Sequence, residues 1–406
     1  MRLATLYKRE RLGEVFQFIR NGASIKQGNP GGIPITRIET IAEGKLDFTR
    51  LGYAGIVELG KYEDYVLVDG DILMSHINSE THLGKAAFVE NLQEAIIHGM
   101  NLLCLRANSS VLYPKYAYHY FKSPFFRNQL FRITKKSVNQ ASFSVSDLKR
   151  LGIILPPLET QRRIADVLDK AQELIDKRKQ QIELLDELLK SVFLDMFGDP
   201  FSNSRGWGVV PLGNLAKLEG GFAFRSIDYT GKGIRLVRIA NVHYEHLDWG
   251  DVCFLPSSYE EEYKHYSLSA GDILIAMTRP IIKSLDSVKV ARVRDSDLPC
   301  LLNQRVGRFK ILDKRLVDEY LYQFCLSSYV KNFVEKFSSV SLQPNISSKQ
   351  IEAIPIPLPP RDSQLKFRDV FYSVVAQQES MRKSLAYMGD NFNSIMQRAF
   401  KGELFS

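Results

Sequence analysis

The stretches GIILPPLETQRRI, residues 152–164, and PIPLPPRDSQLKF, residues 355–367, repeat one pattern within a single chain. Each contains an apolar run typical of a strand, the triplet Leu-Pro-Pro, a polar spacer and a glutamine. Proline cannot donate to a strand ladder, and it disfavours the α region for the residue before it. The double proline therefore predicts the end of a strand, with Thr160 or Ser363 capping a helix that follows.

The repeat extends far upstream of these junctions. VDGDILMSH, residues 68–76, matches SAGDILIAM, residues 269–277, and RLGEV at 11–15 faces PLGNL at 211–215. The two copies are offset by roughly 200 residues. This period is too large for a stacked solenoid repeat, which has 20 to 50 residues. The chain is therefore predicted to be a tandem duplication of a complete unit.

Each copy ends in a strong helical pattern. Apolar residues recur at spacings of three and four from Ile164 to Met196, and again from Val370 to Ala399. Each helix would have about 35 residues and a length of roughly 50 Å. A narrow apolar stripe of that length exceeds what one small domain covers, so we expect the two helices to pack on each other. The alternative is that each helix lies on the face of its own domain.

The residues before each helix mix β-branched and aromatic runs with Gly, Asn and Pro turn signals and one aromatic helical stretch. We therefore expect an α+β fold with two tandem globular domains, each followed by a long helix. The predicted boundaries are 1–155 for the first domain, 156–200 for its helix, 201–358 for the second domain and 359–406 for the C-terminal helix.

The net charge of +8 is concentrated in the globular parts. Residues 1–155 hold 20 Lys and Arg against 14 Asp and Glu, and residues 201–358 hold 20 against 17. Basic domains of this kind favour an acidic partner, most often nucleic acid. Four widely spaced cysteines and the lack of a long apolar run predict a reduced, cytoplasmic protein without a membrane segment.

Catalytic motifs do not stand out. GNPGG at 28–32 lacks the Gly-Lys-Ser/Thr of a phosphate loop, and GGFAF at 220–224 lacks a dinucleotide fingerprint. His243 and His246 stand in a predicted strand and turn without other soft ligands, so no metal site is expected. The sequence thus favours a protein that is not itself an enzyme.

Two basic domains, each ending in Leu-Pro-Pro…Gln and a long striped helix and each containing Gly-Asp-Ile-Leu, resemble the specificity subunit of type I restriction-modification systems. The resemblance implies target recognition domains that each read one half of a split DNA site. It also implies that the helices pair antiparallel as a coiled coil, that the molecule is pseudo-twofold symmetric, and that the half-sites differ.

The resemblance further implies partners. Two methyltransferase subunits would dock on the helices and carry S-adenosylmethionine, and restriction subunits would carry ATP and magnesium, so no cofactor is expected in this chain. Seven apolar residues are expected to dock partners: Leu185, Leu189, Phe193, Phe197, Phe392, Met396 and Phe400. The alternatives are a solo DNA-binding or scaffold protein, or a methyltransferase or nuclease fragment.

Polar side chains able to bond base edges or phosphates cluster in a few predicted loops. The loops that follow the two Gly-Asp-Ile-Leu motifs rank first, with His76, Asn78, His82, Lys85, Arg279 and Lys283. A second group comprises Lys135, Lys136, Asn139, Gln140, Gln343 and Asn345, and LLNQRV adds Asn303, Gln304 and Arg305.

Overall fold

The computed structural model describes residues 7–137, 140–285, 287–338 and 345–405. The chain divides into two compact units. The first unit comprises residues 1–180 and 383–406, and the second comprises residues 181–382. The division cuts both long helices, so each unit contains a globular part and one half of each helix.

The first unit is α+β. Its strands are β1 (Lys8–Arg11), β2 (Phe16–Asn21), β3 (Ile72–Ser75), β4 (Ile77–Asn78), β5 (Ala86–Phe88), β6 (Leu102–Ala107), β7 (Lys135–Lys136), β8 (Ala141–Ser142) and β9 (Gly152–Leu155). Its short helices are α1 (Leu12–Val15), η1 (Ile38–Ile41), η2 (Phe48–Arg50), η3 (Gly60–Tyr65), α2 (Pro114–Lys122), α3 (Pro124–Ile133) and α4 (Val145–Arg150).

The second unit repeats this plan. Its strands are β10 (Gly208–Pro211), β11 (Ala216–Gly220), β12 (Ile234–Val237), β13 (Phe254–Leu255), β14 (Ile273–Ala276), β15 (Ile281–Ile282), β16 (Ser287–Val288), β17 (Val290–Arg292), β18 (Cys300–Leu302), β19 (Val306–Ile311) and β20 (Pro355–Leu358). Its short helices are η4 (Leu212–Asn214), η5 (Ser226–Asp228), α6 (Tyr259–Glu262), η6 (Lys264–Tyr266), η7 (Lys283–Leu285), η8 (Asp295–Asp297), α7 (Asp318–Cys325), α8 (Ser328–Ser338) and α9 (Ser348–Glu352).

The duplication is visible in the sheets. The first unit has a four-stranded sheet in the order β2-β6-β3-β5, and the second has the same order in β11-β19-β14-β17. In each unit a separate two-stranded ladder joins the beginning and the end of the globular part, β1 with β9 and β10 with β20. The predicted duplication of an α+β unit is therefore confirmed.

The two long helices are α5 (Leu158–Phe197) and α10 (Arg361–Lys401), with 40 and 41 residues. Both begin before Thr160 and Ser363, so the predicted caps are wrong and these residues lie in the first helical turn. Among the described residues, no helix is both long and apolar enough to cross a membrane.

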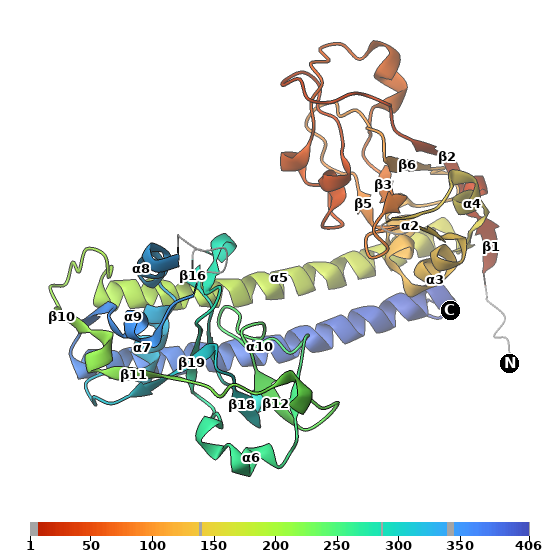
Figure 1. Ribbon diagram of the computed structural model, residues 1–406. Helices are drawn as coiled ribbons and strands as arrows, with labels where there is room; N and C mark the ends of the chain where they lie inside the picture. Colours follow the sequence, from red (N-terminus) through yellow and green to blue (C-terminus); the bar gives the residue numbers. More distant parts are fainter. Residues whose placement is uncertain (1–6, 138–139, 286, 339–344, 406) are drawn as a thin grey trace. The chain divides into compact units, whose positions relative to one another are not determined.

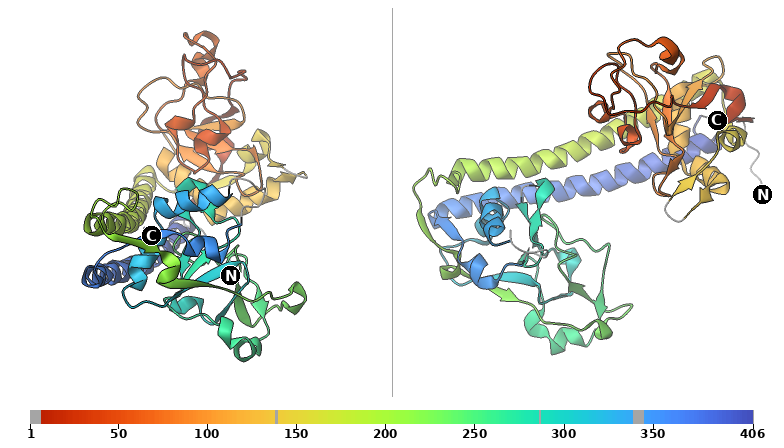
Figure 2. Two further views of the ribbon diagram at one scale, coloured as in Figure 1. Left: turned by 60° about the vertical axis from the view of Figure 1, so that its left-hand side comes forward. Right: turned by 45° about the horizontal axis from the view of Figure 1, so that its top comes forward.

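Within each unit the two helices lie side by side and run antiparallel (Figures 1 and 2). In the first unit Ile164 and Leu168 of α5 share a core with Met396 and Phe400 of α10. The second unit pairs the other ends, and there Phe197 packs edge-on against Phe367 with 5.6 Å between ring centroids. The predicted pairing of the helices is therefore confirmed.

The helix pair also packs on the globular part of its unit. Phe400 lies 5.3 Å from Tyr116 of α2 between ring centroids, and Phe193 lies 5.4 Å from Tyr320 of α7. Each globular part is thus anchored by one end of its own helix and by the opposite end of the other helix. The two sequence-based alternatives for the helices are both realised.

The repeated glutamine explains why the junction occurs twice. Gln161 is fully buried, accepts a hydrogen bond from the Tyr113 amide at 2.8 Å, and donates to the carbonyls of Val111 and Pro156 at 2.9 and 2.8 Å. One side chain thereby joins the start of the long helix to the loop before α2 and satisfies three main-chain groups.

Gln364 repeats these contacts in the second unit. It is also fully buried, accepts from the Val317 amide at 2.9 Å, and donates to the carbonyls of Arg315 and Pro359 at 2.9 and 2.8 Å. The same three bonds form in both units. The spacing that the two junctions share therefore places the glutamine where it joins the start of the long helix to the preceding globular part.

The repeated Gly-Asp-Ile-Leu also has a structural role. Gly70 and Gly271 adopt φ values of 96° and 94°, which residues with a β-carbon rarely reach. Asp71 and Asp272 then accept hydrogen bonds from main-chain amides three residues earlier, at 3.0 and 2.9 Å. The motif therefore makes the tight turn that leads into the buried strands β3 and β14.

Candidate nucleic-acid interface

The loop after β3 and the segment before β9 meet in the first unit. Strand β4 pairs antiparallel with β8, and β8 also pairs with β7, which gives a three-stranded sheet. This sheet joins the loop after Gly-Asp-Ile-Leu, which was predicted first, to the segment at 135–142, which was predicted second. An ion pair of 2.7 Å between Lys136 and Glu80 links the same two segments.

The predicted residues of this cluster differ in availability. Four side chains are exposed to solvent, namely His82, Lys135, Lys136 and Gln140. Asn78 and Lys85 are half-buried, and His76 has only 6% of its surface exposed. Asn139 lies outside the described residues.

Two of the less exposed side chains already bond to the protein itself, Asn78 within the loop and Lys85 to a residue outside the loop. Asn78 donates to the Ser75 hydroxyl at 3.2 Å and accepts from the Ser79 amide at 2.8 Å. Lys85 donates to the Ala42 carbonyl. These two residues have a structural role in the isolated chain. The four exposed side chains remain accessible to a ligand, although Lys136 pairs with Glu80 and His82 bonds to Lys85.

Three separately ranked segments converge in the second unit. The Met277 amide donates to the Arg305 carbonyl, and the Met277 carbonyl accepts from the Ile346 amide, both at 2.9 Å. The next residue, Thr278, forms an antiparallel bridge with Asn345. The loop after β14, the turn at 303–305 and the segment before α9 therefore lie together.

Arg279, Gln304, Arg305 and Asn345 are exposed on this cluster, and Asn303 is half-buried. Lys283 begins the short helix η7, but its side chain, like the whole of Gln343, lies outside the described part of the chain. Thr278 was not among the predicted residues, yet its hydroxyl donates to the Asn345 side chain at 2.6 Å. A small β-branched residue in a polar loop was the available signal.

The two clusters are built on equivalent backbone positions. In the first unit the Phe143 amide donates to the His76 carbonyl at 3.2 Å, and in the second the Ile346 amide donates to the Met277 carbonyl at 2.9 Å. Ile77 pairs with Ser142 as Thr278 pairs with Asn345. The next position along the loop carries Asn78 in one unit and Arg279 in the other.

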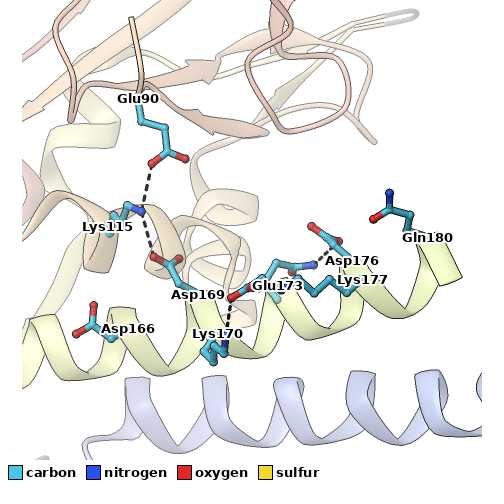
Figure 3. Close-up of a pocket in the computed structure, with 10 residues that line it drawn as sticks. Glu90, Lys115, Asp166, Asp169, Lys170, Glu173, Asp176, Lys177 and Gln180 are labelled. Carbon is cyan, nitrogen blue, oxygen red and sulfur yellow. Dashed lines mark hydrogen bonds and ion pairs between the residues drawn. The ribbon is translucent and has the colours of Figure 1, made fainter.

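A charged groove lies elsewhere in the first unit, between α2 and the first half of α5 (Figure 3). Its lining contains five carboxylates, those of Glu90, Asp166, Asp169, Glu173 and Asp176, and three lysines, Lys115, Lys170 and Lys177. An excess of carboxylates repels phosphate, so this groove is a poor nucleic-acid site. Its ion pairs instead fix the globular part to the helix.

Asp169 is the centre of that network. Its carboxylate lies 2.7 Å from Nε2 of the buried His119 and 3.2 Å from the Lys115 ammonium, which also pairs with Glu90 at 3.2 Å. Burial alone would raise the pKa of Asp169. The hydrogen bond from His119 and the positive charge of Lys115 outweigh burial and lower this pKa below its usual value.

Asp169→Asn is expected to destabilise the first unit by about 1 kcal/mol at pH 7, a value discounted because the side chain is partly exposed. Since the folded-state pKa is depressed, the contribution is present above the unfolded pKa of about 4 and is lost as the pH falls through the folded value. Thermal unfolding between pH 3 and 7 measures this loss.

Asp166→Asn is the matched control for that experiment. Asp166 lines the same groove on the same helix and has no ion-pair partner among the described residues. The difference between wild type and Asp169→Asn should shrink toward pH 3, and the control should track wild type throughout. An effect of Asp169→Asn that is equal at every pH would contradict the assignment.

The predicted docking residues lie mostly in the core. Leu189, Phe193, Phe197, Met396 and Phe400 are at most 7% exposed, and Leu185 and Phe392 are half-buried against the same cores. Side chains enclosed by their own unit cannot form a docking surface, so the prediction is corrected for the five buried residues. The large apolar residues of α5 and α10 that stay exposed are Val167, Leu174, Leu184, Leu188, Leu194, Tyr372 and Tyr387.

The fold and the paired loop clusters define a duplicated α+β protein with two equivalent candidate binding faces. The family model described as the type I restriction modification DNA specificity domain matches the chain twice, at residues 6–184 and 204–386. The chain therefore belongs to the family of type I restriction-modification specificity subunits.

Relatives span nearly the whole chain. The putative type I restriction enzyme MjaX specificity subunit of Methanocaldococcus jannaschii is 33% identical over 371 residues, which cover 87% of this chain and 83% of the relative. The EcoKI specificity subunit of Escherichia coli K12 is 25% identical over 92% of this chain and 82% of its own length. A crystal structure of the S subunit of a type I system from M. genitalium shares the fold, with a TM-score of 0.57, 13% identity and 98% coverage of both chains.

Proposed function

We propose that this chain is the non-catalytic, DNA-reading subunit of a type I restriction-modification complex. The observation that carries the proposal is that polar loops converge at equivalent backbone positions in both units. These loops present exposed Lys, Arg, Asn and Gln side chains. These are the side chains that bond phosphates and base edges. Because the two clusters carry different residues, the two half-sites should differ.

The remaining roles belong to partners. Two methyltransferase subunits carrying S-adenosylmethionine would dock on the helix pair, whose exposed apolar residues offer a surface for them. Restriction subunits carrying ATP and magnesium would join that complex in the cytoplasm. In this proposal the chain needs no cofactor of its own and supplies only the choice of DNA sequence.

The test is to co-express the chain with its methyltransferase and to sequence the methylated bases of the host genome. A single asymmetric motif made of two short sequences and an unspecified spacer is expected. Duplex binding by the purified complex should fall by roughly 10³-fold between 50 and 200 mM salt if six or more phosphates are contacted.

Other outcomes would favour other functions. A scaffold that never meets DNA would show no salt-dependent duplex binding, and a methyltransferase fragment would bind S-adenosylmethionine without any partner. Either result would refute the proposed function.

A further inference from the structure

Arg279 has an unusual backbone conformation within the second cluster. Its φ of 49° lies in the left-handed region, where side chains with a β-carbon are disfavoured. Asparagine tolerates this region best, and among the described residues three of the other four non-glycine residues with positive φ are Asn91, Asn101 and Asn203. An arginine in this conformation therefore has to be held there by its surroundings.

The neighbouring residues provide that restraint. On one side Met277 bonds through its amide and its carbonyl, and Thr278 forms a β-bridge with Asn345 and donates its hydroxyl to the Asn345 side chain. On the other side the Pro280 carbonyl accepts from the Lys289 amide at 2.6 Å. The chain is thus fixed on both sides of Arg279, and the direction in which its side chain leaves the loop is fixed as well.

Within the described part of the chain, the guanidinium is available to a ligand. The Arg279 side chain is exposed and has no hydrogen bond or ion pair to any described residue. At the equivalent position of the first unit, the amide of Asn78 already donates one hydrogen bond to Ser75 and accepts one from Ser79. Of the two described equivalent positions, only the one in the second unit carries a guanidinium.

The hydrogen-bond donors of the Arg279 guanidinium match the acceptors of one base. A guanidinium offers two parallel N–H groups, which match the N7 and O6 acceptors of guanine in the major groove. A phosphate contact tolerates a flexible side chain and does not require a strained, fixed backbone. Resting on the function proposed above, we propose that Arg279 reads one guanine in the half-site of the second unit.

Arg279→Gly tests this reading, because glycine adopts the left-handed conformation freely and so preserves the loop while removing the guanidinium. The methylated motif of the complex is expected to keep the first half-site and to lose preference for guanine at one position of the second. Discrimination at that position should fall by about 5- to 150-fold, the range for one bidentate pair. The melting temperature should not decrease.

Arg279→Lys separates base reading from phosphate contact, since lysine keeps the charge but lacks the two-pronged donor. We expect it to weaken the guanine preference without restoring the wild-type motif, because an ammonium can donate to O6 or N7 but lacks the rigid planar fork. Lys264→Ala removes an exposed charge from η6, beside α6 at the other end of this globular part (Figure 1), and should leave the motif unchanged.

Several results would overturn the inference. An unchanged motif in Arg279→Gly would remove Arg279 from base reading and leave the proposed function standing. A uniform loss of affinity that lysine restores would show a phosphate contact instead. A wild-type complex with no sequence-specific mark would refute both the inference and the proposed function.

Discussion

Gln161→Met should lower the free energy of unfolding of the first unit by about 3 kcal/mol. Methionine nearly fills the space of glutamine, but it leaves the Tyr113 amide and the carbonyls of Val111 and Pro156 without their partner. Each buried main-chain group that loses its hydrogen bond costs about 1–3 kcal/mol, less where water can reach it. Denaturant unfolding combined with amide hydrogen exchange measures the loss and locates it.

Gln364→Met is the parallel change in the second unit, and it should accelerate exchange in residues 181–382 rather than in the first unit. Gln180→Met serves as a control, because Gln180 is exposed and lies on α5 like Gln161. Its replacement should change the free energy of unfolding by less than about 0.5 kcal/mol. A buried-glutamine variant as stable as the control would show that the three bonds are not what secures the junction.

Insertion of one heptad after Gln180 and another before Lys383 should change the methylated DNA site. Both insertions fall where the compact units divide, in continuous helix, and a heptad preserves the apolar stripe. Seven residues add about 10 Å of helix, which corresponds to at most roughly three base pairs. We therefore expect unchanged half-site sequences separated by one to three additional unspecified bases.

Methylation sequencing of the double-insertion complex gives the answer directly. A single insertion provides the control, because it shifts one helix against the other by seven residues and should destabilise the pair. Each added base pair also rotates one half-site by about a tenth of a turn, so some lengths will be accommodated less well than others. A folded, active double-insertion complex that still marks the original spacing would show that the helices do not set the distance.

The fold was largely predictable because its signals are local and repeated. Periodic apolar residues predicted the two long helices, and the Leu-Pro-Pro junction predicted where strands β9 and β20 give way to them. The exact helix starts were not predictable from Thr160 and Ser363, since a proline pair can itself lead directly into a first helical turn. The four-part division into domains and helices stays a prediction.

The candidate site was predictable only in part, because its assembly depends on contacts between distant residues. Residue type selected the loops, but it did not show that Thr278 pairs with Asn345, that His76 is buried, or that Lys85 donates to the Ala42 carbonyl. Likewise, an aromatic helix end such as Phe193 and Phe197 looks the same in sequence whether a partner covers it or its own unit does.

The short ladders β1–β9 and β10–β20 have an evolutionary consequence. Lys8 pairs with Leu155, and Gly208 pairs with Leu358. The beginning and the end of each globular part therefore lie side by side. Exchange of the segment between those paired ends would replace a whole globular part and leave both long helices intact. Such an exchange would give the host a new DNA specificity in one event, with no need to redesign the subunits that act on the DNA.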